Sequence, residues 1–224
     1  MDPERDYRIE VGDSAALTAR EREQVHALFA QAYEQANHDY IDSSLSCLGT
    51  IARARDGDAL VGFALTDVRF AELPRFDAPQ LLLLAGIGCV ELPLRRCGLF
   101  SHLSRSAARA NGLLAAREGR FLACGRMGHP AGFRAMSQLP TVIPREGREL
   151  SDWHLEVGAV VAGLYGVRLK PGSLIVEGSG RPVGHPRIEI DVAPEEWLPF
   201  RDVDRSRGDS LLGLAWQPDV PDGW

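Results

Sequence analysis

Lysine is almost absent from this sequence. Lys170 is its one lysine, and the other basic side chains among the 25 are arginines. A P-loop needs a lysine directly after its glycine-rich turn, so this class of nucleotide site is excluded. Schiff-base catalysis would depend on Lys170 alone, and that residue lies in the segment RLKPG, which is typical of a turn.

Paired cysteines and long apolar runs are also missing. The four cysteines, Cys47, Cys89, Cys97 and Cys124, form no C-x-x-C pair, which favours free thiols in a reducing compartment over a disulfide framework. The longest apolar run, LLLLAGIGCV, is much shorter than a membrane span, and the first ten residues, MDPERDYRIE, carry neither a basic leader nor an apolar core. We therefore expect a cytoplasmic protein without a membrane partner.

Positive charge is in short supply. The formal net charge is −6, whereas proteins that bind nucleic acids in general carry a broad positive surface that replaces counterions on the phosphates. Any anion site must therefore be local, and no nucleic-acid partner is expected. Cys97 with His102, and Cys124 with His129, are each five residues apart, which is no usual zinc spacing, so no metal site is expected.

The first half of the chain predicts a strand, a helix and a hairpin. Residues 7–11 alternate apolar and polar side chains, as a strand does. Thr18 and Glu21 form a capping box ahead of a helical apolar stripe, and the polar segment 37–44 (NHDYIDSS) is predicted to end that helix as a loop. Asp56-Gly57 predicts a tight turn between two strands within residues 50–70.

The second half predicts a buried strand followed by alternating helices and strands. Residues 81–92 are apolar on both faces, and their two glycines predict a bulge or a close backbone approach. A helix is expected from Gly98 onward, and Pro130 opens a later, shorter one. Further strands are predicted at residues 120–126, 173–178, 187–192 and 210–216, with a small-residue-rich helix at 152–166.

The stretch VELPLRRCGLFSHL places Arg95 and Arg96 at the start of a helix. A helix N-terminus is already positive, so two cations there are unfavourable unless an anion lies between them. Gly98 would let the chain turn closely enough for successive N–H groups to converge on a phosphate. Two interpretations stay open on the residues alone: a phosphate site, or two arginines that point into solvent.

The order of strand, V-x-x-P-x-R-R-x-G-L-F, amphipathic helix and strand resembles motif A of the GCN5-related N-acetyltransferase (GNAT) superfamily, Q/R-x-x-G-x-G/A. Arg95 matches the first position and Gly98 the glycine, while Phe100 replaces the final small residue. The resemblance implies an α+β fold with a GNAT-like mixed, mostly antiparallel central sheet flanked by helices and with splayed strands four and five. It also implies a core over residues 1–150, which a C-terminal helix and strands over 151–224 complete.

The resemblance implies an acyl-CoA donor, acetyl-CoA by default, for N-acyl transfer to an amine by direct attack on the thioester. The pantetheine arm would pair with the fourth strand, and the pyrophosphate would bind the following loop. The implied donor-binding residues are Cys89, Val90, Glu91, Leu92, Arg95, Arg96, Cys97, Gly98, Leu99, Phe100 and Ser101. Two alternatives stay open: a catalytically silent acyl-CoA-binding protein, and an acyltransferase whose donor is an acyl-carrier protein.

The catalytic groups are poorly marked. Many members of the superfamily use a tyrosine as acid, but the matching aromatic here is Phe133. Glu91, His129 and His38 are the candidate acid–base residues, and each could equally be structural. The acceptor is unidentified; by resemblance, residues 37–44 would lie near its entrance. The segment 151–224 could complete the sheet, cover the acceptor cleft or form a homodimer surface.

Overall fold

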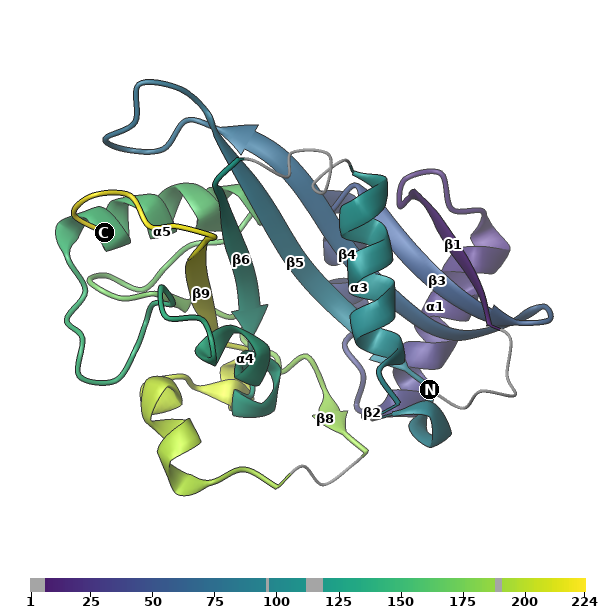
Figure 1. Cartoon of the computed structure of the whole chain (residues 1–224). Helices are drawn as coiled ribbons and strands as arrows, with labels where there is room; N and C mark the ends of the chain where they lie inside the picture. The colour runs from purple at the N-terminus through teal and green to yellow at the C-terminus, as the bar shows by residue number, and fades with distance from the viewer. Residues whose placement is uncertain (1–6, 96, 112–118, 188–190) are drawn as a thin grey trace. The chain divides into compact units, whose positions relative to one another are not determined.

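The computed structural model of this protein describes residues 7–95, 97–111, 119–187 and 191–224 (Figure 1). Its helices and strands follow in one mixed order along the chain. They are β1 (Arg8–Asp13), α1 (Ala19–Ala32), β2 (Tyr33–Glu34), α2 (His38–Cys47), β3 (Thr50–Asp56), β4 (Ala59–Ala71), β5 (Gln80–Val90), α3 (Leu99–Ala110), β6 (Phe121–Met127), α4 (Pro130–Ser137), α5 (Asp152–Leu164), β7 (Ile175–Val176), β8 (His185–Pro186) and β9 (Ser210–Gln217). Short 3-10 turns lie at η1 (Leu92–Leu94), η2 (Pro194–Phe200) and η3 (Arg205–Arg207).

The described strands follow the order β1-β3-β4-β5-β6-β9-β7, with β2 and β8 as a separate pair. The β1–β3, β3–β4, β6–β9 and β7–β9 pairs are antiparallel. The expected α+β class with a mostly antiparallel sheet is therefore confirmed. The chain divides into two compact units, residues 1–68, 85–117 and 183–189, and residues 69–84, 118–182 and 190–224. The expected domain boundary after residue 150 stays a prediction.

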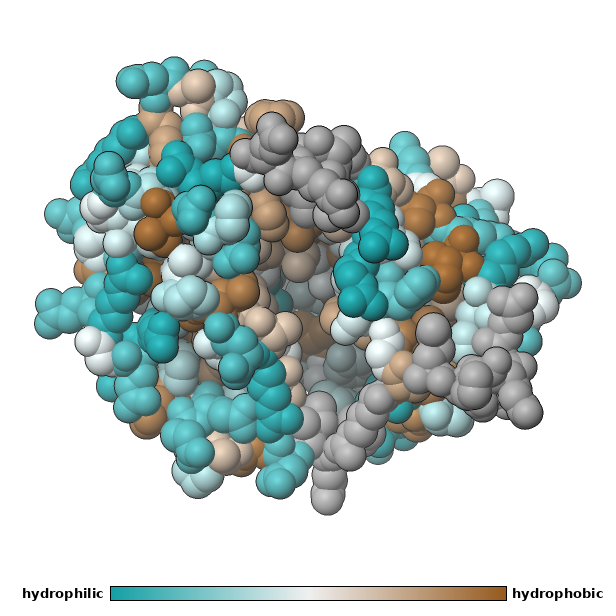
Figure 2. All heavy atoms as spheres, viewed as in Figure 1, coloured by the Kyte–Doolittle hydropathy of each residue, from teal (hydrophilic) through white to brown (hydrophobic). Residues whose placement is uncertain are grey.

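In the first unit, strands β3, β4 and the end of β5 lie between two helices. The predicted hairpin is confirmed: β3 and β4 pair across Gly57, which has a φ of 57°. Figure 1 shows α3 in front of these strands and α1 behind them. Leu99 and Leu103 of α3 pack with Val90 of β5 in one apolar cluster, whose other buried members are Ala52, Ala54, Val61, Ala64, Leu94 and Ala107. The outward face of α3 is hydrophilic (Figure 2).

The start of α1 was predicted correctly. The Thr18 hydroxyl accepts from the Glu21 N–H, and the Glu21 carboxylate accepts from the Thr18 N–H at 2.9 Å. The hydrogen bonds from the Thr18 backbone and side chain, followed by the one from Arg53, lower the pKa of Glu21 to about 2. A carboxylate at a helix N-terminus also opposes the helix dipole favourably.

The loop predicted at residues 37–44 is wrong, because this segment begins α2. The Asn37 side chain caps the helix by accepting from the Tyr40 N–H at 3.3 Å. Ile41 and Leu45 are buried along one face, so two apolar residues four apart suffice to hold this polar helix on the unit. His38 and Asp42 consequently lie one turn apart on a helix and not in a loop.

The second unit contains β6, β9 and β7 with helices α4 and α5. Phe133 of α4 packs with Leu211 and Ala215 of β9 in one apolar cluster, and the Tyr165 hydroxyl, just after α5, donates to the Cys124 carbonyl of β6 at 3.1 Å. The predicted strand at 210–216 and the helices opened by Pro130 and Asp152 are confirmed. The strand predicted at 173–178 shortens to two residues: a turn and a bend precede it, and residues 177–179 have no regular structure.

Residues 187–192 were predicted to form a strand, but the described residues of this segment form none. Residues 188–190 lie outside the described ranges, and Asp191 and Val192 have no regular structure. The two residues before this segment, His185 and Pro186, pair instead with β2.

All four cysteines are free thiols, two of them buried. Among the described residues, no helix is long and apolar enough to cross a membrane.

Candidate functional site

The segment that joins β5 to α3 turns sharply at Gly98. After Val90 the chain makes the turn η1, passes Arg95 and enters α3 with Gly98 as its N-cap, at φ 83° and ψ 0°. This left-handed conformation is strained for any residue with a Cβ. A Cβ on Gly98 would meet no atom of the described residues within 4 Å, so among these residues the space beside this turn is open.

The backbone N–H groups at the start of α3 are free within the described protein. The His102 N–H bonds to the Gly98 carbonyl, but no hydrogen bond joining described residues is donated by the N–H of residues 98–101. No side chain caps this end of the helix either. Unpaired amides at a helix N-terminus carry partial positive charge and bind anions. Whether an anion occupies these amides stays a prediction.

Arg95 lies against the end of β5. Its Nε–H donates to the Val90 carbonyl at 3.3 Å, and its side chain is half-buried. Burial raises the pKa of the Cys89 thiol to about 11 and that of Tyr33 to about 12, and the guanidinium of Arg95 opposes both shifts. Arg95 therefore places a fixed positive charge beside Cys89 and Tyr33. Arg96 lies outside the described residues.

Two large apolar side chains are exposed on the same segment. Leu92 is 41% exposed and Phe100 is 48% exposed. The Phe100 ring lies over β5 at Gly88, where an added Cβ would come within 2.1 Å of a ring carbon. A side chain at position 88 and this ring position exclude each other. The loop thus combines free amides with exposed apolar surface, whereas Cys97 is half-buried and its thiol donates to the Leu94 carbonyl at 2.6 Å.

The carbonyls at the end of β5 are already engaged. That of Val90 accepts from Arg95, that of Glu91 from the Leu94 N–H, and that of Leu92 from the Arg95 N–H. A carbonyl oxygen has two lone pairs, so these groups keep one acceptor position each. The expected pairing of Cys89, Val90, Glu91 and Leu92 with a pantetheine arm stays a prediction.

The direction of the β5 side chains changes between its two central glycines. A Cβ on Gly86 would point at Leu48, which follows α2, whereas one on Gly88 would point at Phe100 of α3. Residues two apart in a regular strand point to the same face, so the strand is irregular between these positions. The two glycines predicted a bulge or a close backbone approach, and an added Cβ would lie 3.0 Å from the Leu65 carbonyl oxygen at Gly86 and from the Phe63 carbonyl oxygen at Gly88.

Glu91 and His129, two of the three candidate catalytic residues, lie in different units. Glu91 is half-buried, and its N–H donates to the Val61 carbonyl of β4 at 3.0 Å. His129 caps α4: its Nδ1 accepts from the Ala131 N–H at 3.1 Å, so the neutral ring carries its proton on Nε2. Burial, assisted by Arg205 and Arg134, lowers the pKa of His129. A catalytic role for either residue stays a prediction.

His26 of α1 lies beside His38 and Asp42 of α2, and the sequence analysis did not place these three side chains together. His26 Nδ1 lies 2.7 Å from His38 Nδ1, and His26 Nε2 lies 2.9 Å from Asp42 Oδ1. The one available signal was the spacing of His38 and Asp42, four residues apart, which is meaningful only once residues 38–47 are known to be helical. His26 comes from another helix and gave no sequence signal.

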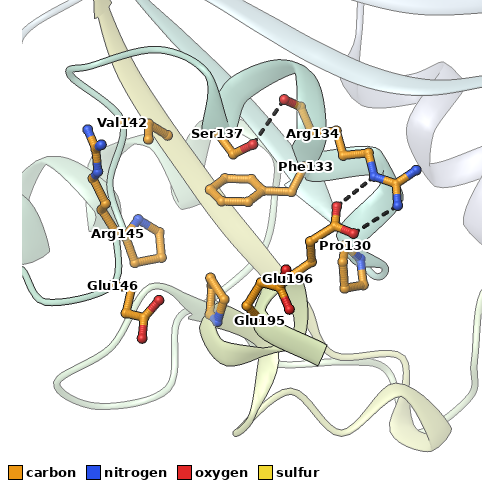
Figure 3. Close-up of a pocket in the computed structure, with 11 residues that line it drawn as sticks. Pro130, Phe133, Arg134, Ser137, Val142, Arg145, Glu146, Glu195 and Glu196 are labelled. Carbon is orange, nitrogen blue, oxygen red and sulfur yellow. Dashed lines mark hydrogen bonds and ion pairs between the residues drawn. The ribbon is translucent and has the colours of Figure 1, made fainter. Parts of the chain in front are cut away.

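The second unit contains a cavity of about 180 Å³ beside α4 (Figure 3). Phe133 and Val142 form part of its wall, and Arg134 and Glu196 pair beside it through two hydrogen bonds of 2.6 and 2.8 Å. The Arg134 hydrogen bond is the main cause that lowers the pKa of Glu196 to about 2. The cavity can hold a small apolar group, but none of the sequence-predicted site residues lines it.

Comparison with solved structures gives similar proteins at low sequence identity. A GNAT family N-acetyltransferase from Escherichia coli, solved in complex with CoA, shares 14% identity over 60% of this chain and 69% of its own, with a TM-score of 0.43. The ribosomal-protein-S18-alanine N-acetyltransferase from Escherichia coli shares 10% identity over 97% and 99% of the two chains, with a TM-score of 0.42.

An IAA acetyltransferase from Bacillus cereus shares 13% identity over 94% of this chain and 99% of its own, with a TM-score of 0.43. No protein-family model matches the chain, and no curated protein matches it in sequence. The matched structures include members of the GNAT family. The functional proposal rests on this chain's own residues.

Proposed function

We propose that this protein is an acyl-CoA-dependent N-acyltransferase, with acetyl-CoA as its donor and an amine as its acceptor. One observation carries the proposal: the backbone N–H groups of residues 98–101, at the start of α3, donate to no acceptor among the described residues, and the described space beside Gly98 is open. A chain with a net charge of −6 concentrates unpaired donors and Arg95 at one turn, and an anion satisfies them.

The turn fits the chemistry of coenzyme A better than that of a simple phosphate. A diphosphate presents several oxygens, and residues 98–101 present successive amide donors. Leu92 and Phe100 add exposed apolar surface next to these donors, which a free phosphate would not use but an organic arm or an aromatic base would. Gly98 has no side chain to enter the open space beside the turn, and its φ of 83° favours glycine at this position.

The protein's own part in the reaction is mainly to bind and to orient. The thioester of the donor supplies the activated acyl carbonyl. Residues 98–101 would hold the diphosphate end, and η1 and Arg95 lie between the end of β5 and this turn in the chain. Fixing both reactants in one geometry can replace much of the need for a strongly marked catalytic side chain. Glu91, His129 and His38 remain the candidate acid–base groups.

Calorimetry with acetyl-CoA, CoA and pantetheine tests this proposal together with a thiol-release assay. The proposal predicts binding of acetyl-CoA and CoA, much weaker binding of pantetheine, and thiol release when a primary amine is added. Binding without release for any amine would identify a silent acyl-CoA-binding protein. Equal binding of pantetheine and CoA would contradict the phosphate site and favour a carrier-protein donor. Native mass spectrometry of freshly purified protein would show directly which pantetheine-containing species it retains.

A further inference from the structure

The contacts among His26, His38 and Asp42 fix where the protons of the two imidazoles lie. Asp42 is an acceptor when ionised, so His26 Nε2 carries a proton and donates it to Oδ1 at 2.9 Å. In neutral His26 the other nitrogen, Nδ1, is then an acceptor. The 2.7 Å contact between the two Nδ1 atoms needs one proton, which His38 Nδ1 must supply.

This arrangement leaves His38 Nε2 as the unprotonated nitrogen of the group. His38 is exposed, whereas the side chain of His26 is 22% exposed. An added proton can enter at His38 Nε2 without breaking either hydrogen bond. A second added proton would place N–H groups on both Nδ1 atoms and break the 2.7 Å contact. His38 Nε2 is therefore the nitrogen of the group that can accept a proton while both hydrogen bonds are kept.

The group connects to β5 through side chains of the same unit. The edge of the His38 ring contacts Phe29, which is fully buried, with centroids 6.5 Å apart. The neighbouring residue of Phe29, Leu28, accepts with its carbonyl from the Cys89 thiol of β5 at 3.7 Å. Phe29 also contacts Tyr33, and the positive charge of Arg95 opposes the rise in the pKa of Tyr33 that burial causes. The histidine pair is thus one layer of side chains away from the strand that leads to the Gly98 turn.

We propose that His38 Nε2 is the general base of the acyl transfer, and that His26 and Asp42 are the positioning residues that fix its tautomer. This inference rests on the proposed function. Catalytic bases are commonly held in one orientation and one tautomer by a hydrogen bond to a second group.

The reaction balances with one proton taken up by His38. The acceptor ammonium gives a proton to His38 Nε2, and the neutral amine attacks the thioester carbonyl. The N–C bond forms, the C–S bond breaks, and the second proton of the nitrogen goes to the leaving thiolate. The products are an amide and CoA thiol, and His38 returns its proton to water. No oxidant, reductant or metal takes part.

Several charged and titratable side chains lie near His26 and His38. Asp39 and Asp42 belong to α2. Tyr33 lies on β2, and its ring contacts that of Phe29. Glu34 of β2 forms an ion pair of 3.2 Å with Arg187, the residue after β8. Burial keeps Tyr33 neutral, because it raises its pKa to about 12. Among the described residues, no group of three His, Cys, Asp or Glu side chains could hold a metal ion, so the pair is not part of such a cluster.

Nitrogen-15 NMR of the histidine side chains tests the proton positions without any substrate. Two-bond correlations above pH 8 should show the Nε2–H tautomer for His26 and the Nδ1–H tautomer for His38. H26Q should leave His38 as a mixture of tautomers. H185Q replaces an exposed histidine of β8 and should change the signals of neither His26 nor His38. An Nε2–H tautomer of His38 in the unmodified protein would overturn the proposal, because that nitrogen could not accept a proton.

Steady-state kinetics with acetyl-CoA and benzylamine test the catalytic role. H38Q should lower kcat/KM about 100-fold, and H26Q about 10-fold with a shifted acidic limb of the pH profile. H185Q should behave as the unmodified protein, and calorimetric binding of CoA should be unchanged in all three variants. Full activity of H38Q would overturn the inference while leaving the transferase intact. Unmodified protein that neither binds acetyl-CoA nor releases thiol would refute the proposed function and, with it, the catalytic role of His38.

Discussion

The Nε–H of Arg95 donates to the Val90 carbonyl across 3.3 Å, so the first arginine of the motif is anchored to the strand that precedes its own turn. An arginine that simply extended into solvent would not be half-buried beside Cys89 and Tyr33. The guanidinium has five N–H donors and spends one of them here, so several remain for an anion. Arg95 is therefore not a fully solvated arginine, and its part in a phosphate site stays a prediction.

Replacing Arg95 with alanine should weaken CoA binding about tenfold, because a charge-assisted hydrogen bond to a phosphate is lost. The residual affinity should also depend less on salt. Calorimetry at two ionic strengths measures both effects. R168A is the matched control, since Arg168 lies in the other unit with a side chain that is 88% exposed. Equal losses in the two variants would point to long-range charge and not to a site.

Gly98→Ala should lower both stability and CoA affinity. The φ of 83° costs a residue with a Cβ about 1–2 kcal/mol, and relief of that strain would turn the amides away from one another. Thermal unfolding and calorimetry report the two effects. Gly163→Ala is the control, because Gly163 ends no turn, has no positive φ and has open space around its Cβ position in α5. That variant should be neutral or slightly stabilising.

Gly88→Ala should destabilise the protein, and removal of the Phe100 ring should suppress the effect. The added methyl would lie 2.1 Å from a Phe100 ring carbon, so one of the two must move. In denaturant unfolding, G88A/F100A should therefore lose less stability than the sum of the two single variants. Additive losses would mean that the ring does not occupy the position described.

Asp209→Asn should destabilise the protein at neutral pH by about 1–3 kcal/mol, because a buried hydrogen-bonded carboxylate is lost. Burial alone would raise the pKa of Asp209, but hydrogen bonds from Lys170 and from the Gly178 and Asp204 N–H groups outweigh it and lower this pKa below its ordinary value of 3.8. The carboxylate thus stabilises the fold above pH 4, and this contribution is lost as the pH falls through its lowered pKa.

Urea unfolding at pH 7 and below pH 4 measures this effect. The stability difference between D209N and the unmodified protein should shrink at acidic pH. D202N is the control, because Asp202 pairs with Arg201 at the surface with a side chain 72% exposed. A difference that is constant with pH would contradict the assigned role of Asp209.

Much of the fold could be predicted because its local signals are strong. The capping box of Thr18 and Glu21, the Asp56-Gly57 turn and the apolar run of β5 each specify structure through nearby residues alone. The helix at 38–47 was missed because its composition is polar and its hold on the protein depends on Ile41 and Leu45, two residues whose burial is a tertiary effect.

The candidate site divides in the same way. Gly98 and Arg95 could be predicted, since the turn, the helix start and the charge are adjacent in sequence. The contact between His26 and His38 could not, because it joins two helices through a packing angle that no local pattern encodes. The capping role of His129 was equally hidden, since histidine is not a residue that normally marks a helix start.

The most direct test of the account follows the backbone amides of the Gly98 turn by NMR during titration with CoA and, separately, with pantetheine. The account predicts large downfield shifts of the N–H signals of residues 98–101 with CoA and little change with pantetheine, as phosphate oxygens become their acceptors. Unchanged signals at saturating CoA would show that the start of α3 does not bind the diphosphate, and would contradict the central claim.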